Sequence, residues 1–552
     1  MPRILGNLGP DLCRDIIQRR IVPLSPSSSS VLERIKGWIE ECTEKHEHTL
    51  PQANFIPTRL LEIVDSGRQV CLHSPGTEHS RYAVLSHCWG PIAPTTLTAR
   101  SLHKLEAGIR TEELPQTFQD AVWLTHQLEI KFLWIDSLCI VQDDPNDWAQ
   151  ESATMHNVYN NAFVAIAASR ATKSSEGFLG NRVEKKYVPV PFHYQGKAGG
   201  VLAFSLPLNH VGDPKRSVWM EHEPLSHRGW ALQERYLSRR TLHFASDQIF
   251  FECEKHCVAE DTFQSNNPSV PEIMSSDRLK EMDEKSCLLE WHRLVEMYSM
   301  RKLTLRDDKL PALSGLAAYF SRQLSVKSCA MDLSNQYLAG LWSNDIIGEL
   351  CWECRGGGIR PAEYRAPSWS WASLDGRIRS HMGPRNALAV VENIHVDLES
   401  PSRSFGKVIG GWISMKVIKL RLHADSGNLR FSEDGVSFRL GCWWDMESFL
   451  GSGRIPSLLS IMKETELLVI PLGWRDYQDQ YQDSHALFGP DCLIVQRVDS
   501  SNWSETTPPI FQRIGLGVAM PESTDGLDLK RLITDKWTVM KQQGNLEDII
   551  VI

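Results

Sequence analysis

Three short apolar segments alternate with two amphipathic ones in the first third of the chain, and this alternation limits the fold more than any other feature. The apolar segments are residues 81–88 (RYAVLSHC), 131–141 (KFLWIDSLCIV) and 162–168 (AFVAIAA), each of a length typical of a buried strand. The intervening segments, 114–128 and 144–159, carry apolar residues at helical spacing. This order predicts an α/β fold, with a parallel sheet and helices on its faces.

Residues with marked positional preferences support these boundaries. Asp144 followed by Pro145 predicts the N-cap and the first residue of the second helix. Further along, residues 230–237 are expected to form a short helix, and residues 241–244 and 248–253 a hairpin. The α/β region is therefore expected to end near residue 255.

The remainder of the chain changes pattern twice. Residues 256–363 are mainly helical in their periodicity, and residues 364–552 alternate in the manner of strands. We therefore divide the chain into a leader with an N-terminal helix (1–50), the α/β domain (51–255), a helical region and a β-rich C-terminal region.

Composition excludes several classes of protein. The net charge is -9 and basic runs are lacking, which argues against a nucleic-acid binder. The 13 cysteines are scattered in a long chain, which favours a reducing compartment. The N-terminal segment lacks the apolar core of a signal peptide, and no run of 18 apolar residues predicts a membrane span. We expect a cytoplasmic protein.

Metal sites are not predicted. Cys42, His46 and His48 are close in sequence, but they are only three ligands, and the two histidines would point apart on a helix. The segments 253–257 (CEKHC) and 351–354 (CWEC) each offer too few ligands for a closed zinc site, and the two would need to meet each other in space to form one.

Three segments together resemble the blocks that define fungal heterokaryon-incompatibility (HET) domains. The first is residues 82–90 (YAVLSHCWG), where His87 stands at a position that is usually Tyr in the family. The second begins at residue 133 (LWIDSLCI) and continues to Tyr159, and the third is residues 228–235 (RGWALQER). Segments at 308–317, 338–342 and 365–373 resemble those that often follow HET domains, so that the resemblance covers most of the chain.

The resemblance implies a role in non-self recognition and programmed cell death when genetically different fungal cells fuse. It also implies self-association through the HET domain and a recognition partner whose identity the sequence does not specify. HET domains are thought to be distantly related to Toll/interleukin receptor (TIR) domains, so a TIR-like, flavodoxin-like sheet is expected. Some TIR domains cleave NAD with a glutamate in a W-C-x-x-E motif, and Trp230 and Glu234 keep that spacing, with Ala231 at the Cys position.

By this analogy, NAD is a candidate substrate and Glu234 the candidate catalytic residue. The carboxylate would stabilise an oxocarbenium-like ribosyl cation, and no bound cofactor is required. Ligands of α/β sheets bind beyond the carboxyl ends of the strands. The residues expected to line the nucleotide pocket there are Ser86, His87, Trp89, Asp136, Ser137, Arg228, Trp230 and Gln233.

Structural interpretations of the same residues stay open at this point. Glu234 is equally suited to pair with Arg228 or Arg239, and Asp136 to cap a loop. The tryptophans of the three blocks are suited to a core. The alternative function is a non-enzymatic module that signals by homotypic interaction.

Overall fold

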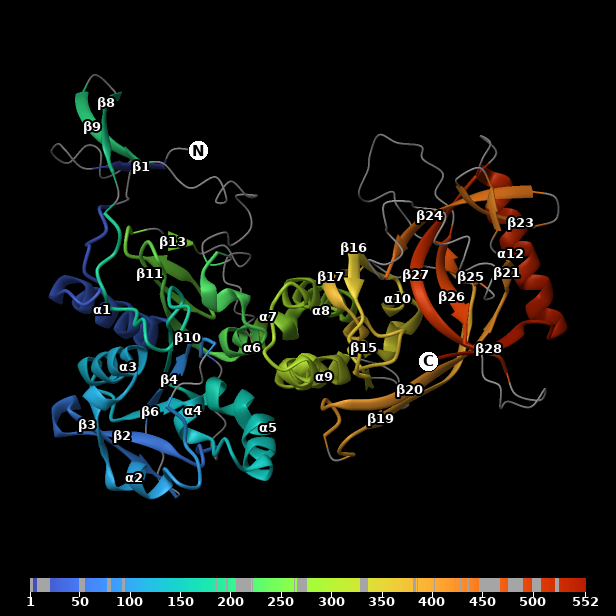
Figure 1. The fold of residues 1–552 in the computed structure, drawn as a ribbon. Coiled ribbons are helices and arrows are strands. Elements are labelled where there is room, and N and C mark those ends of the chain that lie inside the picture. The colour runs from blue at the N-terminus through green and yellow to red at the C-terminus, as the bar shows by residue number, and fades with distance from the viewer. Residues whose placement is uncertain are drawn as a thin grey trace. The chain divides into compact units, whose positions relative to one another are not determined.

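A computed structural model shows two compact units, residues 1–281 and 282–552 (Figure 1). The described residues are 3–6, 20–48, 55–76, 81–91, 95–184, 186–194, 197–204, 220, 222–262, 264–265, 276–327, 336–380, 384, 386–401, 403–421, 423–425, 428–433, 436–445, 467–474, 490–498, 508–521 and 526–552. Much of the predicted leader lies outside them. The four-part division of the chain stays a prediction beside these two units.

Four parallel strands form the centre of the sheet in the first unit. They are β4 (Tyr82–Ser86), β6 (Phe132–Ile135), β7 (Val164–Ala167) and β10 (Arg240–Phe244). Their order across the sheet is β6-β4-β7-β10, with each neighbouring pair parallel. Counted along the chain this is second-first-third-fourth, which is the order in which flavodoxin-like doubly wound sheets begin. The α/β class and the predicted parallel strands are thereby confirmed for the centre of the sheet, which is mixed as a whole.

Antiparallel strands extend this sheet at both edges. The added strands are β2 (Leu60–Val64), β3 (Gln69–His73) and β5 (Ile109–Arg110) at one edge, and β11 (Ile249–Cys253), β12 (Cys257–Ala259) and β13 (Gln264–Ser265) at the other. The predicted hairpin of residues 241–253 corresponds to β10 and β11. A separate three-stranded sheet consists of β1 (Arg3–Gly6), β9 (Lys197–Phe204) and β8 (Val188–Tyr194).

Helices cover both faces of the sheet in the first unit. Figure 1 shows α1 (Ser29–Lys45) and α3 (Gln116–Gln127) on one side, and α5 (Pro145–Asn161) and α6 (Trp230–Leu237) on the other. The apolar faces of α1, α3 and α5 join the strands in one core. Asp144 caps α5 by accepting a hydrogen bond from the Asn146 amide, as predicted. Shorter helices are α2 (Leu102–Ala107) and α7 (Ser276–Glu281).

Two local predictions were wrong. Residues 136–141 do not continue the second strand, because β6 ends at Ile135 and a helical turn, α4 (Asp136–Cys139), follows. An apolar run cannot by itself distinguish a strand from a buried helical turn. In addition, α1 ends at Lys45 and His46 is extended, so His46 and His48 do not lie on a helix.

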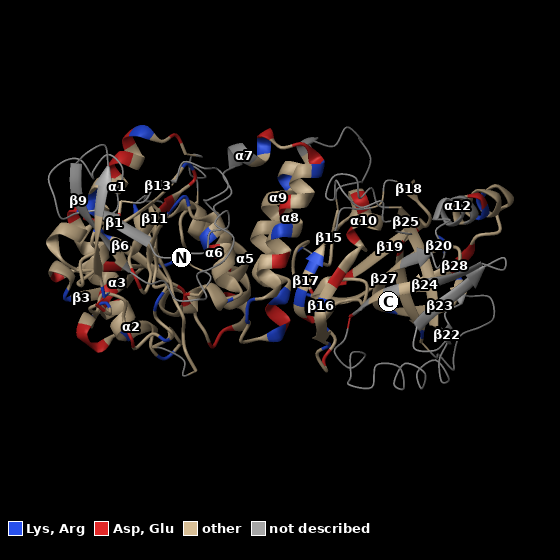
Figure 2. Ribbon diagram, turned by 90° about the horizontal axis from the view of Figure 1, so that it is seen from above, with Lys and Arg blue, Asp and Glu red and all other residues tan. Residues whose placement is uncertain are grey.

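The second unit begins with helices and continues as a β-rich structure. Basic and acidic residues alternate along α8 (Glu284–Ser299), which precedes α9 (Ser314–Lys327) and α10 (Ile346–Glu349) (Figure 2). The same region contains two antiparallel strand pairs: β14 (Tyr337–Leu338) with β15 (Leu341–Trp342), and β16 (Trp352–Ile359) with β17 (Asp375–Ser380).

The C-terminal strands form one eleven-stranded sheet, which agrees with the predicted β-rich region. They are β18 (Asn386–Ala387), β19 (Val390–Leu398), β20 (Val408–Val417), β21 (Leu420–Arg421), β22 (His423–Asp425), β23 (Asn428–Glu433), β24 (Val436–Trp444), β25 (Leu467–Trp474), β26 (Asp491–Arg497), β27 (Ile510–Pro521) and β28 (Glu547–Val551). The helix α12 (Gly526–Gln543) precedes the last strand. Among the described residues, no helix combines the length and the apolar character needed to cross a bilayer.

Buried tryptophans dominate the core between the helices and the β16–β17 hairpin. Trp291 and Trp371 both donate to the carbonyl oxygen of Gly340, at 3.1 and 3.0 Å. Gly340 has φ +103°, and a Cβ there would lie 2.7 Å from the Trp371 Nε1. Only glycine therefore fits this turn without displacing the indole.

Candidate functional site

A cluster of polar side chains lies at the carboxyl ends of β4 and β6. From β4 the chain crosses to β6 on one side and later returns to β7 on the other side. This reversal between β4 and β7 is a topological switch point, where doubly wound sheets leave a crevice for ligands. The helix α6 docks here through a small apolar cluster of Cys88, Ala167, Leu225 and Ala231. The docking brings the third sequence block to the end of the first.

Glu234 is the central residue of this cluster. It lies on α6 and is 3% exposed. Ser86, the last residue of β4, donates a hydrogen bond from its hydroxyl to Glu234 Oε2. The hydroxyl of Tyr159, on α5, also interacts with the carboxyl, and lies 3.3 Å from the Leu85 carbonyl oxygen. The side chain of Glu234, on α6, is thus held by groups from two other elements, β4 and α5.

The charge of Glu234 depends on opposing effects. Burial raises the pKa of this carboxyl, because a charge is costly in a medium of low polarity. The positive charge of the Arg228 guanidinium opposes this shift and lowers the pKa of Glu234. The hydrogen bond from Ser86 lowers this pKa as well. The pKa of Arg228 is in turn raised, against the effect of burial, by Glu234 and then by Asp136. A raised carboxyl pKa with a specific cationic neighbour is common at functional sites and also occurs in structural ion pairs.

The ring of His87 is buried directly after β4. The residue is 1% exposed, and neither ring nitrogen has a hydrogen-bond partner among the described residues. The ring meets Phe118 edge-on at 5.0 Å, and its Nδ1 lies 3.9 Å from Asp136 Oδ1. Burial lowers the pKa of His87 to about 4, so the imidazole is neutral at pH 7. Buried polar atoms are usually satisfied by protein, water or ligand, so these nitrogens mark a place for a polar group.

Asp136 and Trp89 close the cluster on its partly exposed side. The Trp89 Nε1 donates to Asp136 Oδ2 at 2.9 Å, and Asp136 Oδ1 accepts from the Ser137 amide at 2.7 Å. The second contact agrees with the structural interpretation of Asp136 as a residue that orders its own turn. The Ser137 hydroxyl is fully buried and has no hydrogen-bond partner within the described chain.

The remaining predicted residues lie in different settings. Arg228 donates from Nη1 to the His87 carbonyl oxygen and so ties the third block to the first. Trp230 packs against the main core of the unit, and Gln233 is buried on α6. Arg239 instead donates to the carbonyl oxygen of Asn160 at 2.9 Å, so Arg228 is the cation that acts on Glu234.

Sequence reasoning missed Tyr159 as a member of the cluster. Its helical spacing predicted only a core position on α5, and the second block of the family pattern ends at this residue. Cys88 was predicted to be an inert core thiol. Burial raises the pKa of its thiol to about 11, which leaves it protonated and unreactive at neutral pH.

Comparison with known protein families identifies this same region. Residues 82–234 match the family model of the heterokaryon incompatibility protein (HET). The match covers less than a third of the chain and runs from the first residue of β4 to Glu234, so it contains every member of the polar cluster. The comparisons returned no significant match to a curated protein or to a solved structure. The chain therefore contains a HET domain, which indicates a function related to heterokaryon incompatibility.

Proposed function

Because residues 82–234 form a HET domain, we propose that this protein is an incompatibility effector that hydrolyses NAD at the cluster around Glu234. The observation that carries the proposal is a buried carboxyl, held by Ser86, at the switch point of a doubly wound sheet. The neighbouring ring nitrogens of His87 and the hydroxyl of Ser137 lack hydrogen-bond partners in the described chain. They are suited to bind polar groups of a ligand.

The proposed chemistry needs little beyond a fixed negative charge. The nicotinamide of NAD is already cationic, so it leaves without a general acid, and positive charge develops on the ribose as in glycoside hydrolysis. A carboxylate that is already oriented stabilises this charge without reorganising. Ser86 would orient Glu234 in this role, and the Arg228 charge would favour its ionised form.

Access to Glu234 is expected past Trp89 and Asp136. Both are partly exposed, whereas Ser86, His87 and Glu234 are buried. The ribose would lie against Glu234, with the Trp89 indole suited to stack on a planar ring of the substrate. This role makes Trp89 a binding residue and Glu234 the catalytic one.

A second candidate function is a non-enzymatic module that signals by homotypic contacts. The observation that favours it is the 3% exposure of Glu234, whose carboxyl already interacts with Ser86, Tyr159 and Arg228. A carboxyl so fully engaged also suits a purely structural role. In that case the HET domain would self-associate and leave NAD intact.

Nicotinamide release from NAD by the purified full-length protein distinguishes these functions. The assay compares wild type with Glu234→Gln, with a crowding agent present to promote self-association. Glu151→Gln is the matched control, because Glu151 is also buried in the HET domain with a raised pKa but interacts with Arg59 instead. We expect Glu234→Gln to reduce release by at least about 100-fold and Glu151→Gln to retain it. Wild-type protein that is folded and associated but releases no nicotinamide would favour the interaction module.

A further inference from the structure

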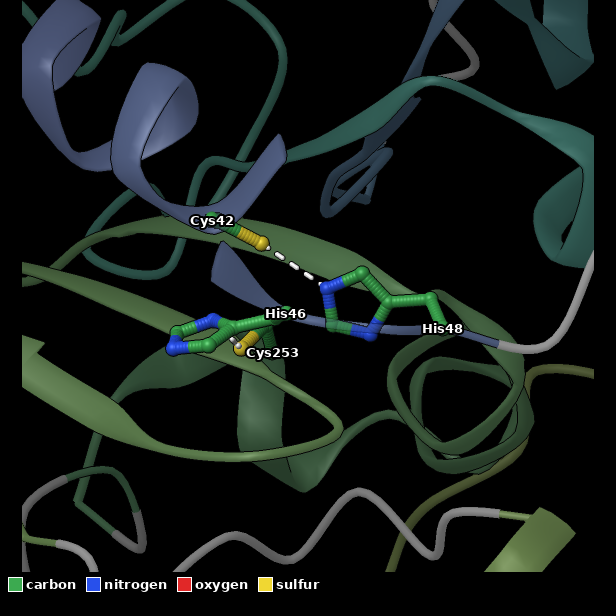
Figure 3. A group of neighbouring side chains, drawn as sticks. All are labelled: Cys42, His46, His48 and Cys253. Carbon is green, nitrogen blue, oxygen red and sulfur yellow. Dashed lines mark hydrogen bonds between the residues drawn. The ribbon is translucent and has the colours of Figure 1, made fainter. Parts of the chain in front are cut away.

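Two cysteines and two histidines meet in the first unit, near the end of α1 and away from the cluster around Glu234. Cys42 lies in the last turn of α1, His46 and His48 follow that helix, and Cys253 is the last residue of β11 (Figure 3). One atom from each side chain, sulfur or ring nitrogen, lies within 4.8 Å of the other three. Cys253 follows His46 by 207 residues, so the fold and not the local sequence assembles this group.

We propose that Cys42, His46, His48 and Cys253 bind one structural zinc ion. Two thiolates and two imidazoles form one of the ligand sets of closed tetrahedral zinc sites. Such a site, with Zn–S near 2.3 Å and Zn–N near 2.1 Å, places its ligand atoms ~3.3–3.8 Å apart. Cys253 Sγ and His46 Nδ1 are 3.6 Å apart, and Cys42 Sγ and His48 Nε2 are 2.9 Å apart. Binding of the ion would separate the second pair by about 0.7 Å and adjust the other pairs, which lie within 4.8 Å of one another.

The groups around the four ligands are those that zinc sites commonly have. The far nitrogen of His48, Nδ1, lies 3.4 Å from the Glu254 carboxylate, and both side chains are almost fully buried. A carboxylate behind a histidine ligand fixes the ring and its tautomer. The Arg240 Nε donates to Cys42 Sγ at 3.2 Å, which suits a thiolate better than a thiol. Both cysteine ligands are themselves fully buried.

His256 occupies a supporting position. Its Nδ1 lies 3.2 Å from Cys253 Sγ, and its ring meets that of His46 edge-on at 4.3 Å. The turn from Cys253 to His256 is closed by a backbone hydrogen bond of 2.9 Å. This turn would present the Cys253 sulfur to the ion and leave His256 as a donor to that sulfur.

With four protein ligands the ion has no open coordination position, so its role would be structural and not catalytic. It would join α1 to the antiparallel part of the central sheet, since the site links the end of this helix to β11. Val31, Ile35 and Ile39 of α1 already pack in the core of the unit. The ion would fix the C-terminal end of α1, which lies beyond these three residues.

The test is metal analysis of the full-length protein, purified with a thiol reductant and dialysed against metal-free buffer. We expect one zinc per chain, released when the thiols are blocked with a mercurial reagent. Replacement by Co²⁺ should give the visible absorption of a tetrahedral site, with charge-transfer bands from two thiolates. A folded protein with less than a tenth of a zinc per chain and no Co²⁺ spectrum would overturn the proposal, as would a Cys42–Cys253 disulfide without metal.

Two variants make the assignment specific. Cys253→Ser should lose zinc by at least tenfold, whereas Cys257→Ser, on the neighbouring strand β12, should retain one zinc per chain. Equal zinc in both variants would refute the assignment. If Cys253→Ser fails to fold, the zinc content and the Co²⁺ spectrum of the wild type decide the question.

Discussion

Acid should destabilise the first unit through His87, and the structure sets the size of the effect. The imidazole is 1% exposed, and its pKa is lowered to about 4 by burial, with Asp136 opposing the shift and Arg228 adding to it. In an unfolded chain the pKa of histidine is about 6.5. Between pH 6.5 and 4 this imidazole therefore binds a proton in the unfolded state but not in the folded state. The free energy of unfolding consequently decreases as the pH is lowered.

The magnitude follows from the difference between these two pKa values. At about 1.4 kcal/mol per pH unit, the gap of roughly 2.5 units corresponds to about 3 kcal/mol once the pH is below 4. At pH 5.5 the loss attributable to His87 should be about 1.4 kcal/mol relative to pH 7.5. His87→Tyr removes the titrating group and introduces the residue that is usual at this position in HET domains. The variant should lose this part of the pH dependence.

The pH dependence of stability can be measured for the first unit alone by urea unfolding with pulsed hydrogen exchange, in which peptides from β4 and β6 are followed by mass spectrometry. The free energy of unfolding is compared between pH 7.5 and 5.5 for wild type, His87→Tyr and a control, His103→Gln, on the exposed surface of α2. We expect the loss on acidification to be smaller in His87→Tyr by about 1.4 kcal/mol and unchanged in the control. Equal losses in all three proteins would refute the view that His87 is buried in its neutral form.

Two further predictions concern stability. Glu260→Gln should lower the unfolding free energy of the first unit by about 3–5 kcal/mol, because Arg182, whose Nη2 lies 2.6 Å from Glu260, would keep a buried charge without its carboxylate. Pulsed hydrogen exchange of peptides from β11 would measure this loss, and a loss below about 1 kcal/mol would contradict the prediction. Trp371→Ala should cost the second unit about 3–5 kcal/mol by opening a cavity beside Gly340; peptides of α8 should report this loss while those of β4 do not change.

The central strands and helices of the first unit could be predicted from the sequence because their patterns are local. The strands β4, β6 and β7 are uninterrupted apolar runs, and Asp144 marks the start of α5 by its own hydrogen bond. The antiparallel strand β11 was predicted as part of a hairpin, but β2, β3, β5, β12, β13 and the turn α4 were missed. Strand pairing such as that of β2 with β6 depends on partners distant in the sequence. Neither the length nor the periodicity of an apolar segment indicates which partner it has.

The same distinction between local patterns and distant contacts applies to the cluster around Glu234 and to the proposed zinc site. The convergence of Ser86 and Asp136 could be expected, because the carboxyl ends of neighbouring parallel strands meet at one edge. That Glu234 joins them from the helix α6 was expected from the position of ligand crevices in such sheets. The lack of a hydrogen-bond partner for the His87 ring among the described residues could not be expected, since it depends on which side chains surround the ring in the fold. Nor could the meeting of Cys42 with Cys253, which joins the end of a helix to the antiparallel strand β11 across most of the sequence of the unit.

The measurement that tests the central claim most directly is cellular NAD during induced expression of the full-length protein in a filamentous fungus. Wild type is compared with Glu234→Gln and Glu151→Gln at equal protein levels. We predict that NAD falls before viability in cells with wild type and Glu151→Gln, and that cells with Glu234→Gln keep both. Death with NAD intact, equal killing by Glu234→Gln, or survival of cells that express folded wild-type protein would contradict the account.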